Sequence, residues 1–295
     1  MADLKNVGQE VASDLKRGAA RGAHAVTGRA APTLDLLARV GYASKGVVYS
    51  TVGLLALGVA LGRGGATTDM QGALLRLQDI PAGRPLLWLL ALGLLGYALW
   101  QLIRAALDPE RQGTGPKGLG KRAGYLLSAL ANLGLAVFSA RLALLGYASR
   151  QQNSEDQVAG TVLNLPAGRL LLLVAGLALL GVAANQLYVA YGAKFMKRMA
   201  FHDISERLCG LLVKIGQVGI TARGLLMLVI GSFALLAAWR DRAREAVGVS
   251  EALTWLRDQP AGNVLLGAVA LGTLCYGVWC GVQALYRRIR VEDAA

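Results

Sequence analysis

Several residue types that soluble enzymes depend on are scarce in this chain of 295 residues. It holds two histidines, three cysteines and seven prolines, and only 17% of it is charged. His24 and His202 have no companions at metal-ligand spacing, which argues against a zinc or haem site. No Ser-His-Asp set, phosphate-binding glycine loop or dinucleotide fingerprint is visible. We therefore expect no catalytic set, metal site or cofactor, and a protein that is not an enzyme.

Cysteine is too rare for a disulfide framework. Cys275 and Cys280 lie in one apolar run, and Cys209 lies in a connecting segment. An odd number of cysteines in such places favours small buried apolar side chains over disulfides.

Carboxylates are absent from the apolar stretches. All 18 Asp and Glu residues fall in the N-terminal arm, the connecting segments or the tail. Proton- and sodium-coupled transporters usually place such groups near mid-membrane. Their absence disfavours ion-coupled transport, although backbone carbonyls can also coordinate ions.

Apolar residues, by contrast, are abundant. The chain is 55% hydrophobic and its mean hydropathy is +0.46, values typical of a protein that crosses a membrane several times. Six charge-poor stretches have about the length that crosses roughly 30 Å of hydrocarbon. They are 46–62, 85–103, 123–140, 170–193, 224–239 and 259–286.

The distribution of basic residues predicts the topology. Six spans return both termini to one side, and the segments on that side hold 21 of the 31 Lys and Arg residues. The positive-inside rule places this side in the cytoplasm. Topology thus accounts for the net charge of +13 without nucleic-acid binding. Residues 1–37 lack the continuous apolar core of a secretory signal, and we expect a polar cytoplasmic arm.

A threefold repeat organises the rest of the chain. A short motif opens an apolar run three times, as Asp79-Ile-Pro81-Ala-Gly83, Asn164-Leu-Pro166-Ala-Gly168 and Asp258-Gln-Pro260-Ala-Gly262. The repeats run over 38–107, 121–192 and 215–287, and a cytoplasmic tail follows at 288–295. Each repeat contains two spans, so successive repeats have the same orientation. The sequence predicts an all-α, six-span transmembrane bundle of three tandem helical hairpins with pseudo-threefold symmetry.

The repeated motif is typical of a helix start. Asp79, Asn164 and Asp258 stand two residues before a proline, where a side-chain oxygen can cap the amide groups of a following helix. Proline suits the first helical turn because it lacks an amide hydrogen. We expect a short surface helix before each motif and a membrane span after it.

The spans carry two repeated faces. Gly46 and Gly53, like Gly224 and Gly231, stand seven residues apart and predict close approach of a neighbouring helix; the second repeat has Ala129 and Ala136 there. Tyrosine and tryptophan recur three residues apart in the first and third repeats, at Tyr97, Trp100, Tyr276 and Trp279. They suit an aromatic belt at the membrane surface or an aromatic-lined ligand cleft.

These elements resemble a known family. Gly41-Tyr42, Lys45-Gly46, Pro81-Ala82-Gly83 and Gly96-Tyr97-Ala98-Leu99-Trp100, with Pro260-Ala261-Gly262 and Tyr276 to Trp279 echoing them, are similar to the domain of unknown function 1206 family. The resemblance covers residues 38–287. It implies a multi-pass protein of the bacterial plasma membrane and carries no activity with it. The second repeat departs from the pattern, because Asn185 replaces tryptophan.

Polar and basic residues supply the remaining candidate sites. Amides in a span either bind neighbouring helices or line a polar passage, and Arg141 either reaches outward to lipid phosphate or guards an anion path. The possible passage comprises Asn132, Arg141, Asn185 and Gln186. Basic residues at the cytoplasmic ends of spans either anchor the topology or bind anionic lipid. The candidate lipid contacts are Lys45, Arg122 and Arg223.

Two functions fit this sequence. The first is an integral membrane protein of unassigned activity with a non-enzymatic packing, scaffolding or lipid-interacting role. The alternative is an uncoupled channel or permease for a small neutral or anionic solute. A membrane enzyme would require a polar pocket around His202 and Glu206. The expected partners are membrane lipids and, as further candidates, other membrane proteins, but not nucleic acid.

Overall fold

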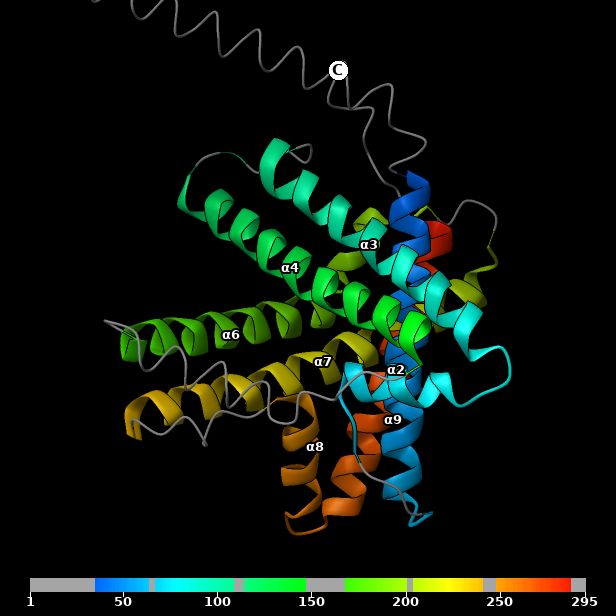
Figure 1. The fold of residues 1–295 in the computed structure, drawn as a ribbon. Helices are drawn as coiled ribbons and strands as arrows, with labels where there is room; N and C mark the ends of the chain where they lie inside the picture. The colour runs from blue at the N-terminus through cyan, green and yellow to red at the C-terminus, as the bar shows by residue number, and fades with distance from the viewer. Residues whose placement is uncertain are drawn as a thin grey trace, which may run out of the picture.

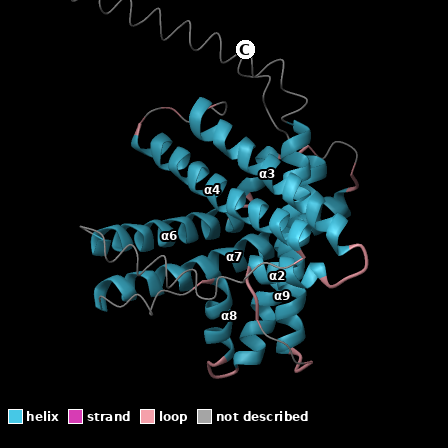
Figure 2. Cartoon of the chain, in the orientation of Figure 1, coloured by secondary structure: helices cyan, strands magenta, loops and turns pink. Residues whose placement is uncertain are grey.

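The computed structural model describes residues 35–63, 67–108, 113, 115–146, 168–200, 204–240 and 248–287. Within these ranges six helices are long and apolar enough to cross a membrane, and no strand is formed (Figures 1 and 2). They are the first helix (Asp35–Ala60), α3 (Gly83–Leu107), α4 (Pro116–Leu145), α6 (Gly168–Tyr191), α7 (Glu206–Arg240) and α9 (Gly262–Tyr286). The predicted all-α class with six spans is confirmed.

The long helices form three units, each with a leading and a returning helix. The leading helices are the first helix, α4 and α7, and the returning helices are α3, α6 and α9. Short helices connect the two in unit 1 (α2, Met70–Gln78) and unit 3 (α8, Val249–Arg257). A 3-10 helix, Lys194–Arg198, follows α6. The connector of unit 2, the N-terminal arm up to residue 34 and the tail lie outside the described residues, as do His24 and His202.

All three leading helices begin earlier than the apolar pattern predicts, since α4 also starts at Pro116, ahead of the stretch that begins at residue 123. The first helix starts by Asp35 and α7 starts at Glu206, whereas the charge-poor stretches start at residues 46 and 224. Lysine and arginine are good helix formers, so they do not end a helix. Lys45 and Arg223 therefore lie inside their helices instead of in flanking segments.

Each leading helix packs against the returning helix of the unit before it, and unit 3 takes that place for unit 1. The α4 helix packs on α3, and α7 packs on α6. The first helix packs on α9 in the same way, because a Cβ added at Gly53 would lie 2.7 Å from the amide nitrogen of Leu274. At the equivalent Gly231 of α7, an added Cβ would lie 3.1 Å from Leu179 of α6. The predicted close approach at these glycines is confirmed, and the first and last units are joined.

The units differ in whether their own two helices pack together. In unit 1 a Cβ at Gly41 would collide with Tyr97, and in unit 3 a Cβ at Gly219 would collide with Tyr276. In unit 2 the equivalent Gly124 faces open space, and α4 and α6 form no comparable interface. Figure 1 shows these two helices fanning apart. The helices therefore follow one another as α4, α3, the first helix, α9, α7 and α6, a ring that is open at unit 2.

The connecting helices also hold the units together, at the end of the bundle where the leading helices finish and the returning helices begin. The Thr67 hydroxyl, just before α2, lies 2.8 Å from the Thr254 hydroxyl of α8, and the Ser250 hydroxyl donates to the Thr67 carbonyl. The Gln78 amide of α2 donates to the Gly146 carbonyl after α4. Leu74 and Leu253 of these short helices are buried in the main apolar core. The two short helices are thus part of the packed structure.

The repeated turn has a different structure from the capped helix start that we expected. Asp79 and Asp258 end the short helices, and neither caps the following helix with its side chain. The long helices begin two residues after Pro81 and Pro260, once Ala82 and Ala261 have adopted a left-handed conformation with φ of 62° and 59°. The expected capping is therefore wrong at both sites, because α2 and α8 extend to these aspartates.

The glycine of the motif has the clearest structural requirement. A Cβ at Gly83 would collide with the Leu77 carbonyl, and one at Gly262 with the Arg257 carbonyl. Only glycine lets the long helix start this close to the end of the short one. In unit 2, Gly168 begins α6, while Asn164 and Pro166 lie outside the described residues.

Candidate functional site

One side-chain contact ties each leading helix to the preceding returning helix. The donor stands two residues before the aligned Gly41, Gly124 or Gly219, and it binds carbonyls in the last turn of the other helix. In unit 2, Arg122 donates to the carbonyls of Ala105 (2.7 Å) and Ala106 (2.9 Å) of α3. The last carbonyls of a helix lack partners within the helix, so this contact satisfies them.

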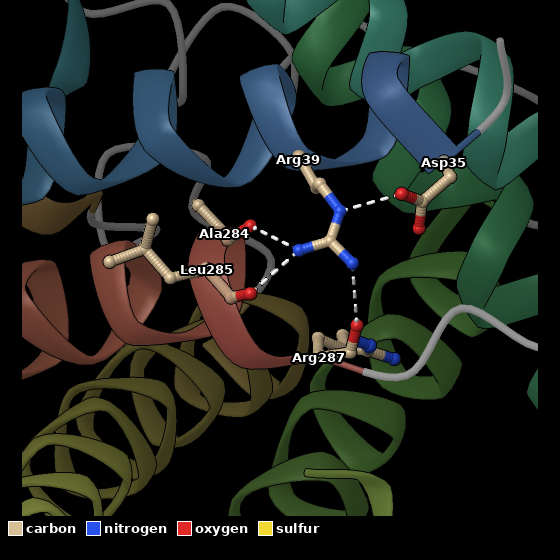
Figure 3. A network of polar contacts seen from close by, with 5 residues as sticks. All are labelled: Asp35, Arg39, Ala284, Leu285 and Arg287. Atoms are coloured by element: carbon tan, nitrogen blue, oxygen red, sulfur yellow. Dashed lines mark hydrogen bonds and ion pairs between the residues drawn. The ribbon is translucent and has the colours of Figure 1, made fainter. Parts of the chain in front are cut away.

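The same contact closes unit 1 onto unit 3. Arg39 donates to the carbonyls of Ala284 (3.0 Å) and Leu285 (2.7 Å) of α9, and its Nε lies 2.6 Å from Asp35 (Figure 3). In unit 3, the Gln217 amide donates to the Ala190 carbonyl of α6 at 3.1 Å. Arg122, a candidate lipid contact in the sequence, is therefore engaged by protein carbonyls.

Two aligned cations lie in the interior of the closed units, and a further buried cation, Arg104 of α3, donates to the Gln101 side-chain oxygen at 2.7 Å. Lys45 is only 7% exposed, and its Nζ lies 4.3 Å from the centre of the Tyr97 ring and 5.9 Å from that of Tyr49. Arg223, at the equivalent place in unit 3, donates from Nη1 to the Tyr276 hydroxyl at 2.7 Å, and its guanidinium carbon lies 5.0 Å from that ring. The second repeat has Ser128 here. We call Lys45, Arg223, Tyr49, Tyr97 and Tyr276 the cation–tyrosine cluster.

The tyrosines join the two cations into one cluster. The rings of Tyr49 and Tyr276 pack edge to face, with their centres 4.7 Å apart. Lys45 faces the first of these rings, and Arg223 binds the second. Cations over aromatic rings are attracted to the negative ring face, which offsets part of the cost of burial.

The bundle supplies no carboxylate to this cluster. Among the six long helices the only acidic residues are Asp35 and Glu206, each the first residue of its helix. No described residue forms an ion pair with Lys45 or Arg223. Within the described part of the chain, no three His, Cys, Asp or Glu side chains gather as a metal site would require. The cluster therefore carries positive charge and is suited to binding an anion.

The aromatic residues are not a membrane belt. Tyr97, Trp100, Tyr276 and Trp279 are all buried, from 1% to 7% exposed. They lie between packed helices: Tyr97 lies against Gly41, Tyr276 against Gly219 and Tyr49, and Trp279 against Gly216 and Phe195. The belt interpretation is wrong because the helices of these units pack along this face.

The candidate polar passage is not brought together by any described hydrogen bond. Asn132 is buried and donates to the Ser128 carbonyl of its own helix at 2.6 Å. Asn185 is exposed on α6, Gln186 is partly exposed beside it, and Arg141 is exposed on α4. Asn185 occupies the place of the buried Trp100, and it is exposed because α4 does not cover that face of α6.

A sequence signal for the cluster was present. Lys45 and Arg223 align between repeats, as do Tyr97 and Tyr276. Each alignment alone suggested a membrane-surface role, because cations and aromatic residues both favour that region. Only the helix pairing shows that the two sets face each other.

Comparison with known proteins assigns the family. A model described as a domain of unknown function, DUF1206, matches residues 40–108, 123–193 and 218–287. The chain belongs to this family. It is also 30% identical over 261 residues to the uncharacterized protein YxxB of Bacillus subtilis (strain 168). The matched region covers 88% of this chain and 94% of that protein. No solved structure matches the chain. The three DUF1206 matches correspond to the three structural units.

Proposed function

We propose that this DUF1206 protein is a non-enzymatic protein of the bacterial plasma membrane with both termini in the cytoplasm and a lipid-interacting, packing role. The observation that carries the proposal is the open second unit. Between α4 and α6, no described residue covers the helix faces that are covered in the other two units. Membrane lipids are the proposed partner of this open flank, other membrane proteins are further candidates, and nucleic acid is not a partner.

The exposed surface of unit 2 has the chemistry of a lipid contact. The α6 helix is the least buried of the six, and Leu177 and Val182 on it are exposed. An apolar groove of about 560 Å³ also lies between α6 and α7. Its lining residues are Leu170, Leu173, Val174, Leu177, Ser232, Leu235, Leu236 and Trp239. Apolar surface of this extent would be costly in water and is suited to acyl chains.

A nitroxide at Val182 tests the proposal. In a variant with Cys209, Cys275 and Cys280 replaced by alanine, Val182→Cys is labelled in liposomes, and its accessibility to oxygen and to a water-soluble nickel chelate is measured. The matched controls are Leu92→Cys, on an exposed apolar face of α3, and Arg257→Cys, on the exposed end of α8. We expect Val182 to resemble Leu92. Access for the nickel chelate, or protection from both reagents, would overturn the proposal.

The alternative function, an uncoupled channel or permease, gives a different result. A water-lined path along α6 would admit the nickel chelate to Val182. Liposomes would also show solute flux that Asn132→Leu or Asn185→Leu abolishes. We expect no such flux from a panel of small neutral and anionic solutes.

A further inference from the structure

We propose that the cation–tyrosine cluster binds a phosphate-type oxyanion at the cytoplasmic side of the bundle. The site is separate from the open flank of unit 2 and does not depend on it. It is formed by the ammonium of Lys45, the guanidinium of Arg223 and the hydroxyl of Tyr276.

The first argument is the uncompensated charge. Lys45 is more than nine-tenths buried, and no described residue accepts a hydrogen bond from its ammonium. Arg223 cannot lose its proton in a protein, so its charge is permanent. A buried charge without a counter-ion is strongly unfavourable, and the long helices offer no carboxylate near either cation. A bound anion would supply the missing charge.

The second argument is the set of unused donors. The Nε of Arg223 is buried and has no hydrogen-bond partner within the described residues. The Tyr276 hydroxyl accepts from Nη1 of Arg223, and its own proton faces the Cys280 thiol, a weak acceptor that a phosphate oxygen can replace. Together with Lys45, these groups provide N–H and O–H donors of the kind that bind phosphate oxygens.

The depth of the cluster suits a ligand from the cytoplasmic side. Lys45 lies about 15 residues from Ala60, and Arg223 about 17 residues from Arg240, the opposite ends of their helices. At about 1.5 Å per residue, both lie roughly 23 to 26 Å from the outer side in the proposed topology. The hydrocarbon is about 30 Å thick, so the cluster lies near its inner edge. Arg223 is partly exposed as a residue although its Nε is buried, so the cluster lies close to the surface of the bundle.

Two sources could supply this ligand. The headgroup of an anionic phospholipid reaches this depth from the inner leaflet, and inorganic phosphate reaches it from the cytoplasm. Both present the same oxygens to the two cations, so the experiment needs one arm for each source.

The first arm measures lipid retention. The full-length protein is incorporated into nanodiscs of equal parts phosphatidylcholine and phosphatidylglycerol, and retained lipid is counted by native mass spectrometry. We expect retained phosphatidylglycerol to fall about tenfold or more in Arg223→Gln and in Lys45→Gln. Arg257→Gln, which removes an exposed arginine at the end of α8, should leave retention unchanged.

The second arm uses phosphatidylcholine nanodiscs titrated with inorganic phosphate, with chloride as the control ion. If free phosphate is the ligand, it should raise the melting temperature of the wild type but not of Arg223→Gln. A positive result in either arm supports the site and identifies the source. Absence of binding in both arms, or binding that Arg223→Gln and Lys45→Gln leave unchanged, would overturn the proposal.

Further variants separate binding from folding. Arg223→Lys and Lys45→Arg keep the charge and should retain most of the binding. Tyr276→Phe keeps both cations and the ring but removes one donor, so it should weaken binding by a smaller factor at an unchanged melting temperature. If the glutamine variants do not fold, these three decide the question: loss of binding in Arg223→Lys and Lys45→Arg, or unchanged binding in Tyr276→Phe, would contradict the assigned donors. The nitroxide result at Val182 depends on none of these residues, so either proposal can fail alone.

Discussion

Neighbouring residues of the repeated Pro-Ala-Gly turn have opposite requirements. Ala261 has a left-handed φ of 59°, which costs a residue with a Cβ about 1 kcal/mol. Gly262 starts the helix against the Arg257 carbonyl, where a Cβ has no room. The same division holds at Ala82 and Gly83, so the turn places glycine where space, not φ, is limiting.

This division predicts stability changes of opposite sign. Gly262→Ala should lower the free energy of unfolding by about 1 to 3 kcal/mol, because the helix start must move. Ala261→Gly should raise it by up to about 1 kcal/mol, because glycine adopts the left-handed region without strain. Unfolding by denaturant in detergent micelles, followed by circular dichroism, measures both. Changes of the same sign would contradict the turn geometry.

Two glycines of the first helix provide a second matched pair. An added Cβ at Gly53 would lie 2.7 Å from the backbone of Leu274, whereas one at Gly58 would meet nothing within 4 Å. Gly53→Ala should therefore cost about 1 to 3 kcal/mol of stability. Gly58→Ala should be neutral or stabilising by up to about 1 kcal/mol, because alanine favours the helix. Equal melting temperatures for the two variants would show that the first helix does not pack on α9 as described.

At the scale of elements, an equivalent contact fastens each leading helix to its neighbour. Arg39, Arg122 and Gln217 hold the last turns of α9, α3 and α6, respectively. Two arginines and one glutamine serve the same purpose because the acceptors are carbonyls, which need donors and not a charge.

Removing one of these donors should loosen a single helix end. Arg122→Leu leaves the Ala105 and Ala106 carbonyls without their side-chain donor, at a cost of about 1 to 3 kcal/mol. Hydrogen exchange should accelerate in the last turn of α3 and remain unchanged in the last turn of α9. Arg141→Leu, on the same helix but exposed, is the control. Faster exchange in both helices would indicate a general loss of structure in place of a local contact.

At the scale of the whole molecule, the sequence pattern predicted the units but not how they associate. Hydropathy identified six spans, and the repeats identified three hairpins, because both signals are local. The glycine faces predicted close approach, but the pattern does not state which helix approaches. The pairing of a leading helix with the preceding unit, and hence the joining of the first helix to α9, depends on contacts between residues far apart in the sequence.

The sequence shows that the second repeat diverges from the other two, but it does not show how this changes the packing of its helices. Val182 and Asn185 replace the tyrosine and tryptophan that fill the interfaces inside units 1 and 3, and Ser128 replaces the cation. These changes suggested a polar passage. They also remove the side chains that hold the two helices of a unit together, and unit 2 is the one that remains open.

The open second unit is the central claim, and disulfide formation between α4 and α6 tests it most directly. Gly124→Cys with Val182→Cys, in a variant lacking the native cysteines, places thiols where the Gly41–Tyr97 contact lies in unit 1. The positive control is Gly46→Cys with native Cys280, since a Cβ at Gly46 would lie 3.6 Å from that of Cys280, a distance suited to a disulfide. On mild oxidation in the membrane, we predict a disulfide in the control and free thiols in the α4–α6 pair. Efficient disulfide formation between residues 124 and 182 would show that the second unit is closed and would contradict the account.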